Sequence, residues 1–272
     1  MIRKCVVSAL LFLTAKLLYA QEAGVNCDLA AVIVVDGQAN EWPMEWIQDD
    51  DKKFSYNFCA DANNLYARMK TSDEYVRRKI ALFGLTLWMD PAGKKKKKLG
   101  LRFPSGVEGK ERMEAIRATM NREEQQKMSS TERAQFQKDM NKSLVADLEV
   151  IELEGLADDP ITSTRSGITT GIKVAIAVAD DGTYVYEAII PLKSFRMSRT
   201  SLDVLGVGFE TGKFTSSSQP TSSKKGAGQG RQMGAGGAGG ANAMSRGQGY
   251  RGVQANPEMS SASSVWTSLK MK

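Results

Sequence analysis

The chain has 272 residues, of which 42% are hydrophobic and 25% charged, and its formal net charge is +6 at pH 7. It contains no histidine, which excludes imidazole general bases, histidine-based catalytic triads and histidine-ligated metals. Its length and hydrophobic content are sufficient for one domain with a substantial core.

The first twenty residues, MIRKCVVSALLFLTAKLLYA, place Arg3 and Lys4 before an apolar stretch and end on Ala20. This order is typical of a secretory signal peptide. The apolar stretch is interrupted by Lys16 and is shorter than the roughly 20 residues of a spanning helix, which disfavours a permanent anchor. We therefore expect residues 1–20 to be a signal peptide and the chain to be exported, to the periplasm or to the outer membrane and cell surface.

Export changes the interpretation of the cysteines. Cys5 would leave with the signal peptide, and the mature chain would keep Cys27 and Cys59. Two thiols in an oxidising compartment predict a Cys27–Cys59 disulfide, and the alternative is two buried free thiols.

Short apolar runs separated by turn residues follow. LAAVIVVDG (29–37) predicts a strand that ends at an Asp-Gly turn. FSYNFCAD (54–61) and LYARMKT (65–71) alternate in the manner of a β-hairpin. LFGLTLWMDPAG (82–93) and LGLRFP (99–104) predict two more strands.

Between residues 106 and 143 the apolar period changes from two to near 3.6, which predicts two helices. Their apolar faces would be formed by Met113, Ile116 and Met120, and by Phe136, Met140 and Leu144. Ser129 followed by Glu132 indicates a capping box at the start of the second helix. Because the strand pattern resumes at VADLEVIELEG (145–155), we expect a helical insertion at 107–143 in a β-rich chain.

Four further strands are predicted in the second half. KVAIAVA (173–179) and TYVYEAII (183–190) flank an Asp-Gly turn, which is a strong hairpin signal. LDVLGVGFETG (202–212) adds a strand, and SSVWTSLKMK (263–272) adds a terminal one.

The stretch at 215–263 is rich in glycine, serine and basic residues and has almost nothing apolar to bury. Ordering it would cost roughly 1 to 2 kcal/mol per residue, so we expect a disordered, flexible loop. The predicted fold class is mainly β: an antiparallel β-sandwich of about ten strands, with its domain at 21–214 and a terminal strand at 264–272 that completes it.

Three motifs resemble a known arrangement: VDGQANEW (35–42), DANNLYARMKTSD (61–73) and YVYEAIIPLKSF (184–195). In this order they resemble the signatures of family 9 carbohydrate-binding modules and the related DOMON-like β-sandwiches of exported bacterial envelope proteins. The resemblance implies a sandwich that binds saccharides by stacking sugar rings on aromatic side chains, sometimes with a bound calcium ion.

Four aromatic residues are the ligand-binding candidates: Trp46, Trp42, Tyr66 and Trp88. Trp42 stands at the signature position, where the resemblance implies packing near the start of the sandwich. Trp46 precedes a polar loop and is expected to be partly exposed, so it is the first candidate for a stacking platform. The alternative for each tryptophan is a packing role in the core.

Two runs of charged residues could either bind a ligand or simply be solvent-exposed surface segments. Asp49, Asp50 and Asp51 could ligate calcium, although a solvated loop has the same composition, and no other cofactor is expected. Lys94–Lys98 could attract phosphate, anionic lipid headgroups or acidic glycans, or it could be a solvated hairpin tip.

The Arg-Gly segment SRGQGYRG (245–252) resembles RNA-binding tails, but an exported protein would rarely meet RNA. We therefore expect no nucleic-acid partner.

Two functions follow from these patterns. The first is a non-catalytic, exported glycan-binding protein that uses aromatic stacking. The second is a structural or interaction subunit of a cell-envelope assembly, with a protein partner docked on the helical insertion and the Gly-rich loop, which a compact sugar-binding module does not need. An enzyme is disfavoured because the chain lacks histidine and a recognisable nucleophile motif.

Overall fold

A computed structural model describes residues 33–119, 127–155, 161–165, 171–214 and 257–271. The predicted signal peptide, Cys27 and most of the predicted Gly-rich loop lie outside these residues. Within them, no helix combines the length and the apolar character that crossing a membrane requires.

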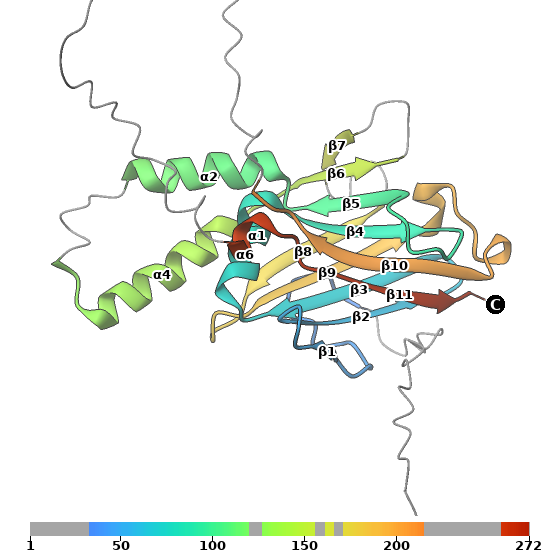
Figure 1. Cartoon of the computed structure of the whole chain (residues 1–272), viewed down its shortest axis with the longest axis horizontal. Coiled ribbons are helices and arrows are strands. Elements are labelled where there is room, and N and C mark those ends of the chain that lie inside the picture. The colour runs from blue at the N-terminus through green and yellow to red at the C-terminus, as the bar shows by residue number, and fades with distance from the viewer. Residues whose placement is uncertain (1–32, 120–126, 156–160, 166–170, 215–256, 272) are drawn as a thin grey trace, which may run out of the picture.

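Two antiparallel sheets pack face to face, which confirms the predicted mainly-β sandwich (Figure 1). The first sheet has the spatial order β1 (Ile47–Asp49), β2 (Phe54–Ala60), β3 (Asn64–Thr71), β9 (Tyr184–Pro191) and β8 (Lys173–Val178). The second has the order β11 (Ser264–Lys270), β10 (Val204–Thr211), β4 (Leu85–Asp90), β5 (Leu99–Phe103), β6 (Val150–Glu154) and β7 (Ile161–Arg165). Pairing of β11 with β10 along seven residues brings the end of the chain back into the second sheet.

The helices are α1 (Glu74–Phe83), α2 (Gly106–Thr119), α4 (Ser130–Val145) and α6 (Pro257–Ser260), with short 3₁₀ turns η1 (Leu192–Phe195) and η2 (Arg199–Ser201). Helices α2 and α4 are the two predicted in the insertion, and they extend beside one end of the sandwich (Figure 1). The predicted capping box is confirmed: the Ser129 hydroxyl accepts from the Glu132 backbone N–H, and the Glu132 carboxylate accepts from that of Ser129.

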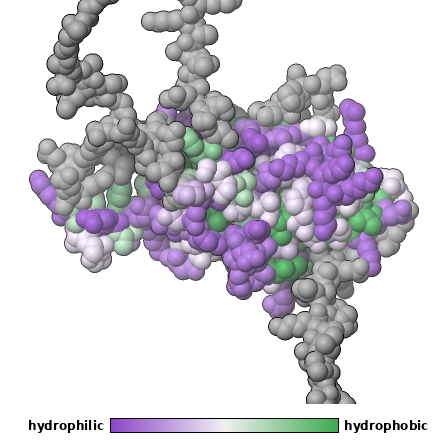
Figure 2. All heavy atoms as spheres, viewed as in Figure 1, coloured by the Kyte–Doolittle hydropathy of each residue, from purple (hydrophilic) through white to green (hydrophobic). Residues whose placement is uncertain are grey.

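Alternation along the strands separates the two faces of the first sheet. On β3, Leu65, Ala67 and Met69 enter the core, while Tyr66, Arg68 and Lys70 project from the opposite, outer face. Aromatic rings fill the centre of the core, where Phe58 stacks on Phe209 with centroids 4.8 Å apart. Most of the surface seen in Figure 2 is hydrophilic, as expected for a sandwich with an internal core.

Two sequence predictions need correction. The strand predicted at 29–37 is wrong for its described part, because residues 33–37 form no strand there. The backbone N–H groups of Asp36 and Gly37 donate to the Glu187 carboxylate, so they are not available to a strand ladder. Leu82 and Phe83, predicted to open a strand, belong to α1, which Asp73 caps by accepting from the Val76 backbone N–H.

A stability prediction follows from Tyr186. Its ring is fully buried, and its hydroxyl has no hydrogen-bond partner among the described residues. A buried donor without a partner costs about 1 to 3 kcal/mol, so we expect Tyr186→Phe to raise the free energy of unfolding by about 1 kcal/mol in urea denaturation. Tyr184→Phe is the matched control, because the Tyr184 hydroxyl donates to the Asn141 carbonyl at 3.2 Å and its removal should not stabilise. Destabilisation by Tyr186→Phe would contradict this assignment.

Candidate functional site

The outer face of the first sheet carries two buried side chains of opposite charge on neighbouring strands. Arg68 on β3 lies directly opposite Glu187 on β9, and both are almost completely buried. Burial lowers the pKa of Arg68 to about 10, and the nearby Glu187 and Glu45 carboxylates oppose that shift. The guanidinium remains charged at neutral pH, so each of the two groups offsets the buried charge of the other.

Residues 33–46, called the N-terminal segment below, cover this pair. The Glu187 carboxylate accepts from the Trp42 indole N–H at 2.6 Å and from the Gly37 backbone N–H at 2.7 Å. Arg68 in turn donates to the backbone carbonyls of Ala39 and Met44. The pair therefore satisfies both donors and acceptors of the segment and holds it across the sheet.

Gly37 is required where the segment enters. Its φ is +82°, in the region that favours glycine, and a Cβ at this position would lie 2.5 Å from the Ala177 Cβ on β8. This close approach explains the Asp-Gly step of the VDGQANEW motif. That motif meets the glutamate of YVYEAIIPLKSF through these hydrogen bonds.

Trp42 and Trp46 have different surroundings. Trp42 is 6% exposed and packs edge-on against Tyr66, with ring centroids 6.4 Å apart. Trp46 is half-buried: its ring centroid lies 4.0 Å from the Arg68 guanidinium carbon and 4.6 Å from the Lys70 Nζ. The two cations restrain the Trp46 ring beside open solvent.

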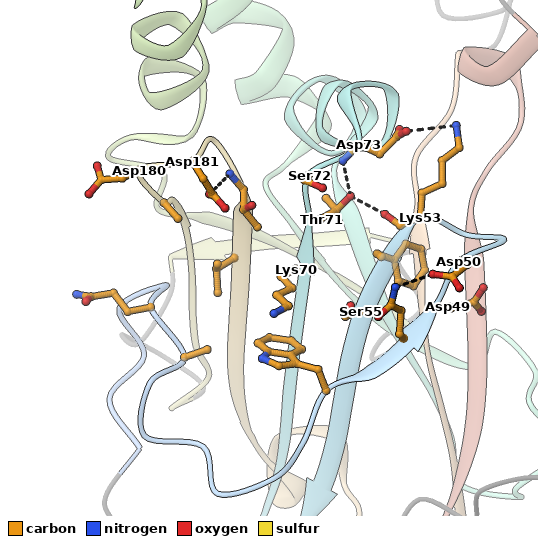
Figure 3. Close-up of a pocket in the computed structure, with 18 of the residues that line it drawn as sticks. Asp49, Asp50, Lys53, Ser55, Lys70, Thr71, Ser72, Asp73, Asp180 and Asp181 are labelled. Atoms are coloured by element: carbon orange, nitrogen blue, oxygen red, sulfur yellow. Dashed lines mark hydrogen bonds and ion pairs between the residues drawn. The ribbon is translucent and has the colours of Figure 1, made fainter.

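Trp46 lines a pocket of about 980 Å³ on this sheet. Lys70 lies between two acidic turns in Figure 3, one from β1 to β2 and one from β8 to β9. The polar side chains that line the pocket are Gln38, Asn40, Gln48, Asp49, Asp50, Lys53, Ser55, Lys70, Thr71, Ser72, Asp73, Asp180, Asp181 and Thr183. Two aromatic residues also line the pocket, the half-buried Trp46 and the buried Phe54, so that Trp46 is the more accessible aromatic ring among many hydrogen-bonding groups.

Tyr66 and Trp88, the other two predicted residues, do not line the pocket. Tyr66 is 8% exposed, and its hydroxyl donates to the Asp61 carboxylate at 2.6 Å. Burial, together with this hydrogen bond, raises the pKa of Tyr66 to about 12. Trp88 is 7% exposed and lies on β4 in the second sheet. The structure thus gathers Trp42, Trp46 and Tyr66 on one sheet face and separates Trp88 from them. A ligand-binding role for each of the four stays a prediction.

Several lining residues are absent from the sequence-based prediction. Asp180 and Asp181 have the pattern of a hairpin turn, and Lys70 has the pattern of an outward strand residue, so neither pattern indicates a site. The one available signal is Glu187, a charged residue inside the apolar run YVYEAII. It points to a buried partner but not to a pocket.

Calcium binding at Asp49–Asp51 stays a prediction, whereas part of the disulfide prediction can be compared with the structure. Among the described residues, no group of three or more cysteine, aspartate or glutamate side chains is placed to hold a metal ion. Asp49 and Asp50 instead accept from the Lys52 backbone N–H and the Gln48 amide. Cys59 is fully buried and disulfide-bonded, whereas its predicted partner Cys27 lies outside the described residues.

Comparison with known proteins gives few matches. No family model matches the chain, and no curated protein matches it. The solved structures that match include two of a family 9 carbohydrate-binding module from Caldicellulosiruptor kristjanssonii. The complex with cellotriose is 10% identical, covers 69% of this chain and 75% of the module, and has a TM-score of 0.30. The complex with glucose is 10% identical, covers 69% and 77%, and has a TM-score of 0.29. These values do not place the chain in that family, and the function below rests on the geometry of the site.

The buried pair generates a stability prediction. Glu187→Ala would leave the Arg68 charge buried without its counter-charge, and we expect it to lower the free energy of unfolding by about 3 to 5 kcal/mol. Urea denaturation monitored by tryptophan fluorescence measures this change. Adding Arg68→Met should recover part of the loss, because the uncompensated charge is then removed as well.

Asp50→Ala is the matched control for this variant. Asp50 is exposed, and its carboxylate accepts a hydrogen bond from the exposed Gln48 amide at 2.6 Å, so loss of this side chain should change stability by less than about 0.5 kcal/mol. Equal effects of Glu187→Ala and Asp50→Ala would show that the buried pair does not hold the N-terminal segment.

Proposed function

We propose that this protein binds a glycan in the pocket of the first sheet, with Trp46 as the stacking platform, and does not cleave it. The observation that carries the proposal is the half-buried Trp46 ring, held beside Arg68 and Lys70 at a pocket of hydroxyl, amide and carboxylate groups. Sugars present an apolar C–H face to an aromatic ring and hydroxyl groups to polar side chains. A pocket with an aromatic wall and converging polar groups matches both.

The charges of the pocket favour a neutral glycan over an acidic one. Lys53 is already paired with Asp73 at 3.2 Å and with Glu258 at 3.1 Å. Four other carboxylates line the pocket beside Lys70: Asp49, Asp50, Asp180 and Asp181. Of these, Asp180 is paired with Lys142 at 3.9 Å, which leaves three negative charges beside the one positive charge of Lys70. A uronate or a sulfated sugar would meet this excess negative charge.

The chemistry of the Asp180–Asp181 turn supports a non-catalytic role. A glycosidase needs a carboxylic acid whose pKa is raised, so that it can donate a proton near neutral pH. The Thr183 backbone N–H donates to the Asp181 carboxylate at 2.9 Å and lowers the pKa of Asp181. Asp181 therefore stays ionised and accepts hydrogen bonds. Export through the signal peptide at 1–20 would bring the pocket into contact with envelope or extracellular glycans.

The direct test is Trp46→Ala in a glycan array followed by titration calorimetry. We expect the variant to lose about tenfold or more in affinity, because stacking is removed, while the urea midpoint changes little. Trp46→Phe should retain most of the binding. Trp266→Ala is the matched control, since Trp266 lies on β11 of the other sheet. Unchanged affinity in Trp46→Ala, or an equal loss in Trp266→Ala, would sink the proposal.

A second candidate function, an interaction subunit of an envelope assembly, is favoured by the helical insertion. Among its described residues, α4 buries only Leu144 and Val145 in its last turn, and α2 buries Met113 in the core but leaves Val107 61% exposed. A helix that is mostly exposed contributes little to the core and offers a docking surface.

The interaction hypothesis predicts that deleting residues 107–143 releases a partner that co-purifies with the tagged full-length chain. Mass spectrometry of detergent extracts measures this release, and the Trp46→Ala variant provides the control that should retain the partner. Absence of any stoichiometric partner in the wild-type extract would remove this candidate.

A further inference from the structure

The pocket and the lysine run lie at opposite ends of the sandwich. Strand β3 ends at the pocket and, after α1, β4 runs back to Asp90, where the turn carrying Lys94–Lys98 begins (Figure 1). Strand β10 starts beside this turn, since Gly206 pairs with Asp90 and a Cβ on Gly93 would lie 3.0 Å from Val204 Cγ1. The chain after β9 also leads into the start of β10.

We call this region the basic end. It is defined by Lys94–Lys98 in the turn between β4 and β5 and by Lys193 and Arg196 directly after β9, and all of these side chains are exposed.

The lysine turn has a defined conformation. The buried Asp90 carboxylate accepts from the backbone N–H of Ala92 at 3.0 Å and from that of Lys96 at 2.9 Å. Burial acts to raise the pKa of Asp90, but the backbone hydrogen bonds outweigh it and lower that pKa. Asp90 therefore holds the backbone of the turn in place, and the lysine side chains of the turn are exposed to solvent.

Few carboxylates neutralise the basic end. Lys97 pairs with Glu210 at 2.6 Å, and the other four lysines of the run form no ion pair with the described residues. Four other described carboxylates lie at or near this end: Glu154 pairs with Arg102 at 2.7 Å, Asp90 is buried under the turn, Asp61 accepts from the Tyr66 hydroxyl, and Asp203 is exposed. Counted over the described residues, the basic end carries more positive than negative charge.

We propose that the basic end binds the surface of a lipid bilayer that contains anionic headgroups, so that the pocket faces away from the membrane. Clusters of about four to eight lysines and arginines near a surface bind anionic lipids. The charges stand on two protruding segments, and Val204, 36% exposed and in contact with the turn, adds an apolar side chain between them. A bilayer surface accommodates both charged and apolar groups over a broad area, which favours it over a soluble acidic polymer.

The test is co-sedimentation of the full chain with vesicles of phosphatidylcholine alone and with vesicles in which about a third of the lipid is phosphatidylglycerol. We expect binding to the anionic vesicles only, weakened by added salt. Replacing Lys94, Lys95, Lys96 and Lys98 by glutamine should reduce that binding by about tenfold or more. Lys97 is kept because it pairs with Glu210.

The matched control replaces four lysines of the helical insertion, Lys110, Lys127, Lys138 and Lys142, by glutamine. It makes the same change in net charge at the other end of the molecule and should bind the anionic vesicles within about twofold of wild type. If both variants bound the anionic vesicles equally weakly, the effect would depend on net charge alone, and the proposal would be overturned. The proposal would also be overturned if the variant of the lysine turn bound the anionic vesicles as strongly as the wild-type protein, because another segment would then be responsible for binding. Retention on immobilised polyphosphate without vesicle binding would also overturn it, in favour of an acidic polymer.

Discussion

A carboxylate can be buried only where donors and a counter-charge replace the water it loses, and Glu187 is completely buried. Arg68 on the neighbouring strand supplies the charge, and the N-terminal segment supplies the indole and backbone donors. The dependence is mutual, because the same segment has no strand partner among the described residues and finds its hydrogen bonds on this pair. The outer face of the first sheet is thereby covered by a segment that forms no strand and whose Ile33, Ala39 and Trp42 side chains are buried.

The position of the pocket follows from this arrangement. Once Trp42 is fixed by its hydrogen bond to Glu187, the chain runs four residues further and places Trp46 over the remaining outward residues of β3. Trp42 thus anchors the N-terminal segment to the sheet, and Trp46 lies at the end of that segment and lines the pocket. The acidic turns at the same end of the sheet complete the lining, while the lysine turn at the opposite end leaves a molecule with two chemically distinct poles.

Much of the fold can be predicted from the sequence, because alternation and turn residues act locally. The hairpins of β2 with β3 and of β8 with β9, both insertion helices and the Ser129 capping box are confirmed. Local sequence patterns do not predict which strands pair when they are far apart in the sequence. An apolar run at 33–35 has the composition of a strand, yet it forms none. The backbone N–H of Asp36, the next residue, instead donates to Glu187, which is 151 positions away in the sequence. The pocket is harder still, since Lys70 and Asp181 come from separate hairpins and have ordinary surface patterns.

The most direct test of this account is an NMR titration that follows the side-chain N–H signals of the four tryptophans while neutral and acidic oligosaccharides are added separately. The account predicts that a neutral oligosaccharide shifts the Trp46 signal strongly, leaves Trp88 and Trp266 in place, and affects Trp42 only weakly because its N–H stays bonded to Glu187. Shifts centred on Trp88 or Trp266 would place the site on the second sheet and contradict the account, as would the absence of any shift with all of the sugars.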